Sequence, residues 1–463
     1  MGYQTTNPYT GEVVQKFEEL TEAELREVVT TADEAFRSWR TTPVADREVV
    51  LQRAADALRA DKSRYAEILT LEMGKVIGEA EAEVELSADI LEYYAQHAAK
   101  FLEPQPLQVK DPNAGRVYLS REPLGVIYAI EPWNFPYYQL ARVAGPQLAA
   151  GNTMIVKHAE NVPQAALAFE KLLADAGAPK GIYTNVFISH ELSNTLIADQ
   201  RVRGVALTGS ERAGAAVATE AAKNLKKSTL ELGGADAFIV LDDADVDKAA
   251  DWAVLGRHWN AGQVCVSSKR LIVDDSVYDR FMDRYRAGVA TLKAGDPMDR
   301  STTLAPLSSD GAASRLQSQV EQAIANGAKA EQLGDPVPTQ GNFFQPTILT
   351  DIAPDNPARH EEFFGPVSQV YRVSGEEEAI KVANDSPYGL GGSVFTSDPD
   401  RGERVSQQVD TGMIFVNHPT GVKADLPFGG VKNSGYGHEL IDLGFNEFLN
   451  IKVIGVTDID AAF

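Results

Sequence analysis

Cysteine is almost absent from this chain, whose 463 residues include only one, Cys265. A single cysteine cannot form an intramolecular disulfide, so the fold is expected not to depend on oxidation, and the reducing cytoplasm is the expected location. No run of about 18 uninterrupted apolar residues occurs, which argues against a transmembrane helix. The first residues also lack the basic segment and apolar run of a signal peptide, so none is expected.

Basic residues are also in short supply. The chain has 43 Lys and Arg residues against 66 Asp and Glu residues, a formal net charge of −23. Because a negative field repels polyanions, no nucleic-acid or membrane partner is expected. The seven histidines are scattered, and neither His190 nor His438 has a second histidine at ligand spacing, so no metal site is expected. With 44% hydrophobic and 24% charged residues, the composition is that of a globular enzyme.

The usual dinucleotide fingerprint, Gly-x-Gly-x-x-Gly after a strand, is missing as well. In its place Gly204-Val-Ala-Leu-Thr-Gly-Ser210 leads from an apolar segment into a predicted helix over 211–222. Ser210 would cap this helix, and the helix N-terminus could receive a pyrophosphate. Lys157 and Glu160 follow another apolar segment and could bind ribose hydroxyls. Capped strand-to-helix turns are common, so this signal alone is weak.

The patterns that are present predict helices first and then alternating strands and helices. Residues 21–102 are helical in pattern, with a capping box at Thr21 and a break at Gly74, and 103–122 suit an exposed strand or arm. Short apolar runs then alternate with amphipathic helices, which is typical of parallel sheets. The predicted strands are 126–130, 153–156, 183–188, 204–207, 237–241 and 270–273, with helices at 140–150, 164–176, 191–199, 246–258 and 277–292. The tail 446–456 reads as an apolar strand that needs a partner edge, such as one in another subunit.

Cys265 is the first candidate for chemistry. A lone cysteine is more often a small buried hydrophobic residue than a nucleophile. Here it follows a polar and apparently flexible approach, Asn260-Ala-Gly-Gln263, directly after a predicted helix. An element that begins near the sulfur would lower the thiol pKa through its backbone N–H groups.

A thiolate that attacks a carbonyl needs an oxyanion donor and a base that later activates water. Asn134 lies in Pro132-Trp-Asn-Phe-Pro136, just past a predicted strand, and its neutral amide is a suitable donor. Glu231 is flanked by leucines and followed by two glycines, so its carboxyl is expected to be buried with a raised pKa. The alternatives are an asparagine in a proline-bounded turn and a strand-edge glutamate turned to solvent.

Seven motifs together resemble the aldehyde dehydrogenase superfamily, in that family's order and over nearly the whole chain. They are Pro132-Trp-Asn-Phe-Pro136, Thr208-Gly-Ser210, Leu230-Glu-Leu-Gly-Gly234, Gly262-Gln-Val-Cys265, Glu362-Phe-Phe-Gly-Pro-Val367, Asn384-Asp-Ser-Pro-Tyr-Gly-Leu390 and Pro427-Phe-Gly-Gly-Val-Lys-Asn-Ser-Gly435. The resemblance implies an α/β fold with two Rossmann-like open-sheet domains, one cofactor-binding and one catalytic, plus a small β oligomerisation arm. The implied bounds are 1–103 and 124–231 for the NAD(P)-binding domain, 232–433 for the catalytic domain, and 104–123 with 434–463 for the arm. A homodimer or homotetramer is typical of the family.

The resemblance also implies roles for individual residues. Cys265 is the nucleophile, Asn134 and the Cys265 backbone N–H form the oxyanion hole, and Glu231 is the general base for NAD(P)-dependent oxidation of an aldehyde. The implied cofactor-binding residues are Trp133, Lys157, Glu160, Thr208, Gly209, Ser210, Gly214, Leu232, Gly233, Glu362 and Phe364. Because a carboxylate at Glu160 would repel a 2′-phosphate, NAD is expected to be preferred, with NADP possible.

The sequences of residues 157–161, 210–215 and 444–451 are similar to those of the succinate-semialdehyde dehydrogenase branch. Arg142 matches an arginine that binds the substrate carboxylate in that branch, although pairing with an internal acid is an equal alternative. Trp259 stands where branch members with two arginines have the second one. Another ω-oxo acid or small polar aldehyde therefore stays open as substrate. A thiol esterase or acyltransferase that needs no dinucleotide is the alternative from a different class.

Overall fold

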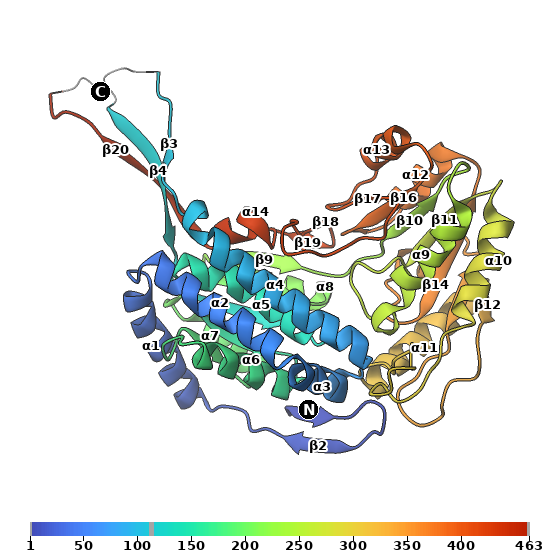
Figure 1. Ribbon diagram of the computed structural model, residues 1–463, viewed down its shortest axis with the longest axis horizontal. Coiled ribbons are helices and arrows are strands. Elements are labelled where there is room, and N and C mark those ends of the chain that lie inside the picture. Colours follow the sequence, from blue (N-terminus) through green and yellow to red (C-terminus); the bar gives the residue numbers. More distant parts are fainter. Residues whose placement is uncertain (1, 111–114, 461–463) are drawn as a thin grey trace.

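The computed structural model describes residues 2–110 and 115–460; residues 1, 111–114 and 461–463, which fall in the predicted first and arm segments, lie outside the described residues. Two sheets with helices on their faces lie side by side, and a β arm extends away from the first of them (Figure 1). The predicted α/β fold class is confirmed; the domain bounds stay a prediction.

The chain begins with a hairpin and a set of helices. The elements are β1 (Gln4–Thr6), β2 (Val13–Lys16), α1 (Glu22–Trp39), α2 (Val44–Ala60), α3 (Lys62–Met73) and α4 (Ile77–Phe101). The predicted capping box is present, since the Thr21 side chain accepts from the Glu24 backbone and Glu24 accepts from the Thr21 backbone. Gly74, at φ 81°, ends α3 in the left-handed region as a glycine does most easily.

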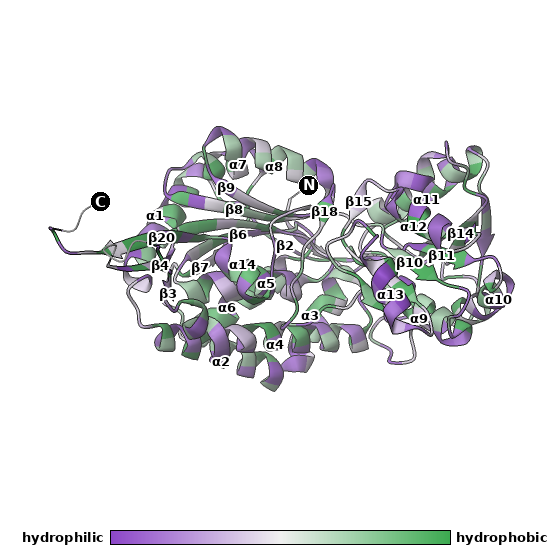
Figure 2. Cartoon of the chain, turned by 90° about the horizontal axis from the view of Figure 1, so that it is seen from above, coloured by the Kyte–Doolittle hydropathy of each residue, from purple (hydrophilic) through white to green (hydrophobic). Residues whose placement is uncertain are grey.

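The first sheet has six strands in the order β19-β9-β8-β5-β6-β7. Its elements are β5 (Val126–Glu131), α5 (Pro136–Ala150), β6 (Thr153–His158), α6 (Pro163–Asp175), β7 (Tyr183–Asn185), α7 (His190–Ala198), β8 (Val202–Thr208), α8 (Glu211–Lys223), β9 (Lys227–Glu231) and β19 (Gly435–Tyr436). Strands β5 to β9 are parallel, and β19, which the sequence placed in the arm segment, pairs antiparallel with β9. Helices α2 to α6 cover one face and α1, α7 and α8 the other (Figure 2). The strand predicted at 183–188 is shorter than expected and ends at Asn185.

The second sheet has the order β12-β13-β14-β11-β10-β16-β17. Its elements, with those that pack on it, are β10 (Ala237–Val240), α9 (Val246–His258), the 3-10 helix η1 (Trp259–Gly262), β11 (Arg270–Asp274), α10 (Tyr278–Val289), α11 (Asp310–Ala325), β12 (Lys329–Gln332), β13 (Thr347–Thr350), η2 (Pro357–His360), β14 (Val367–Val373), α12 (Glu376–Asn384), β16 (Gly392–Phe395), α13 (Pro399–Ser406) and β17 (Phe415–Val416). Successive side chains of a strand point to opposite faces, so Phe238 and Val240 pack with α9 and α10, whereas Ala237 and Ile239 pack with α11 and α12. Burial on both faces explains why the central strand β10 is a continuous apolar run.

The arm is a three-stranded antiparallel sheet of β20 (Leu449–Val456), β4 (Arg116–Pro123) and β3 (Gln105–Pro106). The strand predicted at 446–456 starts later than expected because Ile441–Asn446 forms helix α14. A short pair, β15 (Tyr388–Gly389) with β18 (Val431–Lys432), completes the strands described here. No helix within 2–110 and 115–460 is long and apolar enough to cross a membrane.

Candidate active site

A cleft lies where the parallel strands of the first sheet end. Strand order reverses beside β5, since β6 and β7 follow on one side and β8 and β9 on the other. Ligands of open α/β sheets bind at such a switch point, outside the carboxyl ends of the strands. The cleft has a volume of about 730 Å³, and the predicted residues that line it are Trp133, Lys157, Glu160, Thr208 and Gly209.

The turn after β8 has the expected helix cap. Ser210 accepts a hydrogen bond from the Ala213 backbone N–H at 3.3 Å and so caps α8. A Cβ atom on Gly214 would lie 2.8 Å from the Leu232 side chain, so this glycine allows α8 to approach the segment after β9. Ser210 and Gly214 are not among the residues that line the cleft. They determine where α8 begins and how closely it packs beside the cleft.

Lys157 and Glu160 come together at the end of β6. Their side chains form an ion pair at 3.8 Å, and Lys157 is buried whereas Glu160 is partly exposed. Burial lowers the pKa of Lys157, while the Glu160 carboxylate acts in the opposite direction. The two residues therefore present one cation and one carboxylate to the same end of the cleft.

The segment before Cys265 is a strained and buried turn. Asn260 and Ala261 have φ values of 50° and 52°, and Gly262 has φ 75°. A Cβ on Gly262 would lie 2.4 Å from the Gly365 carbonyl oxygen, so only glycine fits there. Left-handed non-glycine residues cost about 1–3 kcal/mol each and persist where surrounding contacts fix them.

Those fixing contacts come from Gln263. Its amide donates to the Asn260 carbonyl at 3.1 Å and its side-chain oxygen accepts from the Ser308 backbone N–H at 2.9 Å. Asn260 and Gln263 are both fully buried. The sequence interpretation of a flexible polar approach was wrong, because these side chains are bonded inside the protein.

Cys265 lies in a turn, and part of its surface remains accessible. Residues 266–269, which follow Cys265, do not form a helix, contrary to the expected source of a lowered pKa. Burial of the sulfur instead raises the thiol pKa to about 11, and the positive charges of Arg142 and Lys269 partly oppose this rise. Activation of this thiol at neutral pH therefore requires a group that accepts its proton.

Asn134, in the bend between Pro132 and Pro136, lies against the cysteine turn. Its side-chain amide donates to the Gln263 carbonyl at 3.2 Å, and its own carbonyl accepts from the Asn260 side chain at 3.0 Å. The residue is buried. One of its two amide N–H groups is used in this contact, and the other is left as a donor.

Glu231, the last residue of β9, is only 2% exposed. Within the described parts of the chain, neither of its carboxylate oxygens has a hydrogen-bond partner. Burial raises the pKa of this carboxyl well above 4.5, and the neighbouring Glu439 raises it further. This is the buried carboxyl expected from sequence, and the alternative of a solvent-facing glutamate is excluded.

The glycines after Glu231 bring β9's continuation against the cysteine turn. A Cβ on Gly234 would lie 2.5 Å from the Cys265 carbonyl oxygen, and one on Gly233 would lie 2.5 Å from a Glu362 carboxylate oxygen. Glu362 accepts from the Gly234 backbone N–H at 3.1 Å. The Phe364 ring meets the edge of the Trp133 ring, with centroids 5.7 Å apart. Gly234 thus lies against the Cys265 main chain, Glu362 lies against Gly233 and Gly234, and Phe364 contacts Trp133, which lines the cleft.

Arg142 is buried and fully engaged. It forms an ion pair with Glu439 and donates to the Tyr138 hydroxyl at 3.0 Å and to the Thr208 hydroxyl at 3.1 Å. This is the internal-acid pairing that the sequence left as an alternative. Trp259 packs on the Phe135 ring, with centroids 5.2 Å apart.

Three charged residues of this site were missed by the sequence analysis: Glu131, Lys269 and Glu439. Glu131 is buried at the end of β5 and lines the cleft, and its only sequence signal was a carboxylate closing an apolar strand. Lys269 precedes the buried strand β11, where a lysine is unexpected. Glu439 gave no signal as a partner of Arg142, because the two residues are far apart in sequence.

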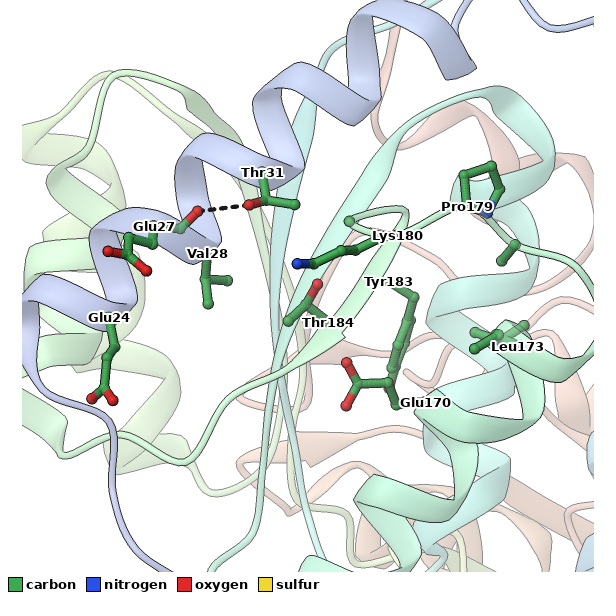
Figure 3. A pocket seen from close by; sticks show the side chains of 13 residues that line it. Glu24, Glu27, Val28, Thr31, Glu170, Leu173, Pro179, Lys180, Tyr183 and Thr184 are labelled. Carbon is green, nitrogen blue, oxygen red and sulfur yellow. Dashed lines mark hydrogen bonds between the residues drawn. The ribbon is translucent and has the colours of Figure 1, made fainter.

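A second hollow of about 440 Å³ lies apart from this site, between α1, the end of α6 and the segment leading into β7 (Figure 3). Glu24, Glu170, Lys180 and Tyr183 are among the residues that line it. None of the predicted site residues does, so the 730 Å³ cleft is the one that matches the chemistry.

An open parallel sheet with a cleft outside the carboxyl ends of its strands is typical of dinucleotide-binding enzymes. The family model "Aldehyde dehydrogenase family" matches residues 1–454. The chain belongs to the aldehyde dehydrogenase family, and it is an NAD(P)-dependent enzyme that oxidises an aldehyde.

The chain is 49% identical over 452 residues to the succinate-semialdehyde dehydrogenase NADP(+) of Deinococcus radiodurans, covering 98% of this chain and 94% of that protein. A probable succinate-semialdehyde dehydrogenase NADP(+) of Synechocystis is 41% identical, with 98% and 100% covered. The crystal structure of succinic semialdehyde dehydrogenase from Streptococcus pyogenes in complex with NADP+ has a TM-score of 0.96 at 48% identity, covering 98% of this chain and all of that one. These names do not support the expected preference for NAD, whereas NADP was allowed.

Proposed function

We propose that the chain oxidises its aldehyde through a covalent thioester on Cys265, with Asn134 and Glu231 as the other catalytic residues. The observation that carries this proposal is the buried, unpaired carboxyl of Glu231 on the strand that continues directly to the cysteine turn. An unpaired buried carboxyl costs free energy and is expected where it has a chemical role.

The residues of the chain would act in sequence. Glu231 takes the thiol proton, the Cys265 sulfur attacks the carbonyl carbon, and the second Asn134 amide N–H and the Cys265 backbone N–H donate to the oxyanion. The resulting thiohemiacetal loses a hydride and becomes a thioester. Glu231 releases the thiol proton to solvent and then takes a proton from water, whose oxygen attacks the thioester carbon. The carboxylic acid leaves as the proton on Glu231 passes to the Cys265 sulfur.

The cleft fits a nicotinamide dinucleotide. Thr208 and Gly209 precede the capped N-terminus of α8, which suits a pyrophosphate, and Lys157 with Glu160 suits the adenosine ribose. At the inner end, Glu362 and Phe364 would hold the nicotinamide ribose beside Cys265, with Leu232 and Gly233 behind the ring. When bound, the nicotinamide supplies the hydride acceptor for the oxidation.

Replacing the nucleophile tests the proposal directly. Cys265→Ala is expected to abolish oxidation of a panel of aldehydes, measured as dinucleotide reduction. Because the chain has one cysteine, iodoacetamide should modify a single site and abolish activity in parallel. Native turnover by Cys265→Ala would overturn the proposal, and ester hydrolysis without dinucleotide at a comparable rate would favour a thiol esterase.

Succinate semialdehyde is the proposed substrate, supported by the names of the relatives and by Arg142 near the site. Arg142 is buried and already forms an ion pair with Glu439. It would therefore have to share its guanidinium between Glu439 and the substrate carboxylate. Trp259 would contribute an apolar wall where a second arginine is missing.

The test of this step compares two aldehydes on one variant. Arg142→Ala should raise KM for succinate semialdehyde far more than KM for an uncharged aldehyde such as butanal. Equal changes would remove the carboxylate-binding role and leave Arg142 as a partner of Glu439.

For cofactor choice we propose a preference for NAD with NADP accepted. Glu160 places a partly exposed carboxylate where a 2′-phosphate would repel it, and Lys157 reduces that repulsion. The NADP(+) names of the relatives point the other way, so kcat/KM for both dinucleotides is the deciding measurement. Glu160→Gln should improve NADP use relative to NAD, and a native preference for NADP would defeat this step.

A further inference from the structure

Lys269 lies behind the cysteine turn, between that turn and Glu362. Its ammonium donates to the Val264 carbonyl at 2.6 Å and to the Cys265 carbonyl at 2.7 Å, and it lies 3.0 Å from a Glu362 carboxylate oxygen. The side chain is 1% exposed. The ammonium therefore donates two hydrogen bonds to main-chain carbonyls and forms one ion pair.

We propose that Lys269 is a positioning residue that sets the direction of the Cys265 backbone N–H and anchors Glu362 with the same ammonium. The inference rests on the proposed function, in which that N–H donates to the oxyanion and Glu362 holds the nicotinamide ribose. Nothing in the sequence pattern around Cys265 requires a lysine four residues later.

The direction of the N–H follows from peptide planarity. The carbonyl of Val264 and the N–H of Cys265 belong to one trans peptide, so they point in opposite directions. Because Lys269 holds the carbonyl on its own side, the N–H must point away from Lys269. A cationic donor on the carbonyl also polarises the peptide and makes its N–H a stronger donor.

Neighbouring buried cations do not share this arrangement. Arg257 donates to the carbonyls of Gly262, Phe363 and Val367 and to the Ser267 hydroxyl, and Arg270 donates to those of Ala235, Val382 and Ala383. Both therefore bond interior main chain, and Arg257 also bonds a hydroxyl. Lys269 is distinguished by joining the main chain of the nucleophile to a carboxylate of the cleft.

The proposal predicts a split between two reactions of the same sulfur. Attack on an aldehyde needs the oriented N–H, whereas alkylation by iodoacetamide forms no oxyanion. Lys269→Met should therefore slow single-turnover oxidation by about 10²–10³-fold, the effect of losing one oxyanion donor. Alkylation of Cys265 should slow less than tenfold, through loss of the nearby positive charge. The control is Lys248→Met, an exposed lysine of α9 that should change neither rate.

Chemical rescue separates hydrogen bonding from charge and from misfolding. Lys269→Ala with added ethylammonium should recover at least tenfold in oxidation rate, whereas tetramethylammonium, which has no N–H, should give no recovery. Glu362→Gln should mainly raise KM for the dinucleotide, because the carbonyl contacts of Lys269 remain.

Equal loss of oxidation and alkylation in Lys269→Met would overturn the positioning role, as would equal rescue by the two cations. Native oxidation by Lys269→Met while Cys265→Ala is inactive would reject this inference alone. Native oxidation by Cys265→Ala would instead reject the proposed function and, with it, the oxyanion role that Lys269 is said to serve.

Discussion

At the scale of single residues, one guanidinium is surrounded by more carboxyls than it can neutralise. Arg142 lies among the buried carboxyls of Glu131, Glu231 and Glu439. Burial raises the pKa of each of the three, and Arg142 opposes the rise by favouring the charged form. Because Glu439 pairs with Arg142 directly, Glu131 and Glu231 are the two that favour the neutral form.

The same substitution at these two positions should give opposite results. Glu231 must lose its proton to act as a base toward both the thiol and water, so Glu231→Gln should slow the first turnover of reduced dinucleotide and thioester hydrolysis, each by about 10²–10⁴-fold. Burial favours the neutral form of Glu131, and Glu131→Gln keeps an uncharged side chain there, so steady-state turnover at pH 7 should stay within a few-fold of native. Stopped-flow and steady-state assays measure both.

The dependence of turnover on pH tests whether Glu231 acts as the base. Native turnover should rise with pH as Glu231 ionises, and this limb should be missing in Glu231→Gln but present in Glu131→Gln. Equal loss of turnover in both variants would contradict this prediction. It would show that Glu131 also takes part in the proton transfer.

The sequence could predict a residue's role where its neighbours along the chain indicate that role. Asn134 between prolines, Glu231 between leucines and Ser210 at a strand-to-helix turn all carry local signals, and each lies where the pattern indicated. Glu131, Lys269 and Glu439 act through partners brought together only by folding, and their neighbours in the chain do not indicate those partners. The thiol pKa was mispredicted for the same reason, because burial depends on segments distant in sequence.

At the scale of elements, helix α6 is capped by a residue from another helix. Its own N-cap, Val162, has no capping side chain. Glu72 of α3 instead accepts from the backbone N–H groups of Gln164 at 2.9 Å and Ala165 at 2.8 Å, and from the Thr5 hydroxyl of β1. One carboxyl therefore joins β1, α3 and α6, which no local capping pattern could reveal.

The stability of this junction should depend on pH. Burial raises the pKa of Glu72 to about 7, above the 4.5 of an unfolded chain, so the neutral carboxyl stabilises the fold below about pH 4.5 and this contribution is lost as pH rises through 7. The full change is on the order of 3 kcal/mol. Glu72→Gln resembles the neutral form, so the thermal midpoint of the native protein should fall relative to the variant between about pH 4.5 and 7.

Glu67→Gln, on an exposed position of the same helix, is the control and should show a constant difference from native. Circular dichroism at one fixed scan rate measures all three proteins. A native midpoint that gains on Glu72→Gln as pH rises would contradict the assigned direction.

At the scale of the whole molecule, the arm leaves the body with one face uncovered. In β20, Ile451 is 50% exposed and Val453 is 63% exposed, and these alternate residues point to the same side. Strand β20 is also an edge of its sheet, so its outer backbone groups lack a strand partner among the described residues. Such an edge is normally covered.

We propose that the chain assembles through this arm into a homodimer or homotetramer, since a symmetric copy would cover the same apolar strand. Light scattering should then give a mass that is a multiple of 50.1 kDa. Ile451→Lys with Val453→Lys places two charges on the face that a second copy would cover, and should reduce that multiple. The control, Val13→Lys with Val14→Lys, changes two comparably exposed valines of β2 and should leave the mass unchanged. A native mass of 50.1 kDa would show that the exposed arm is not an interface between copies of this chain.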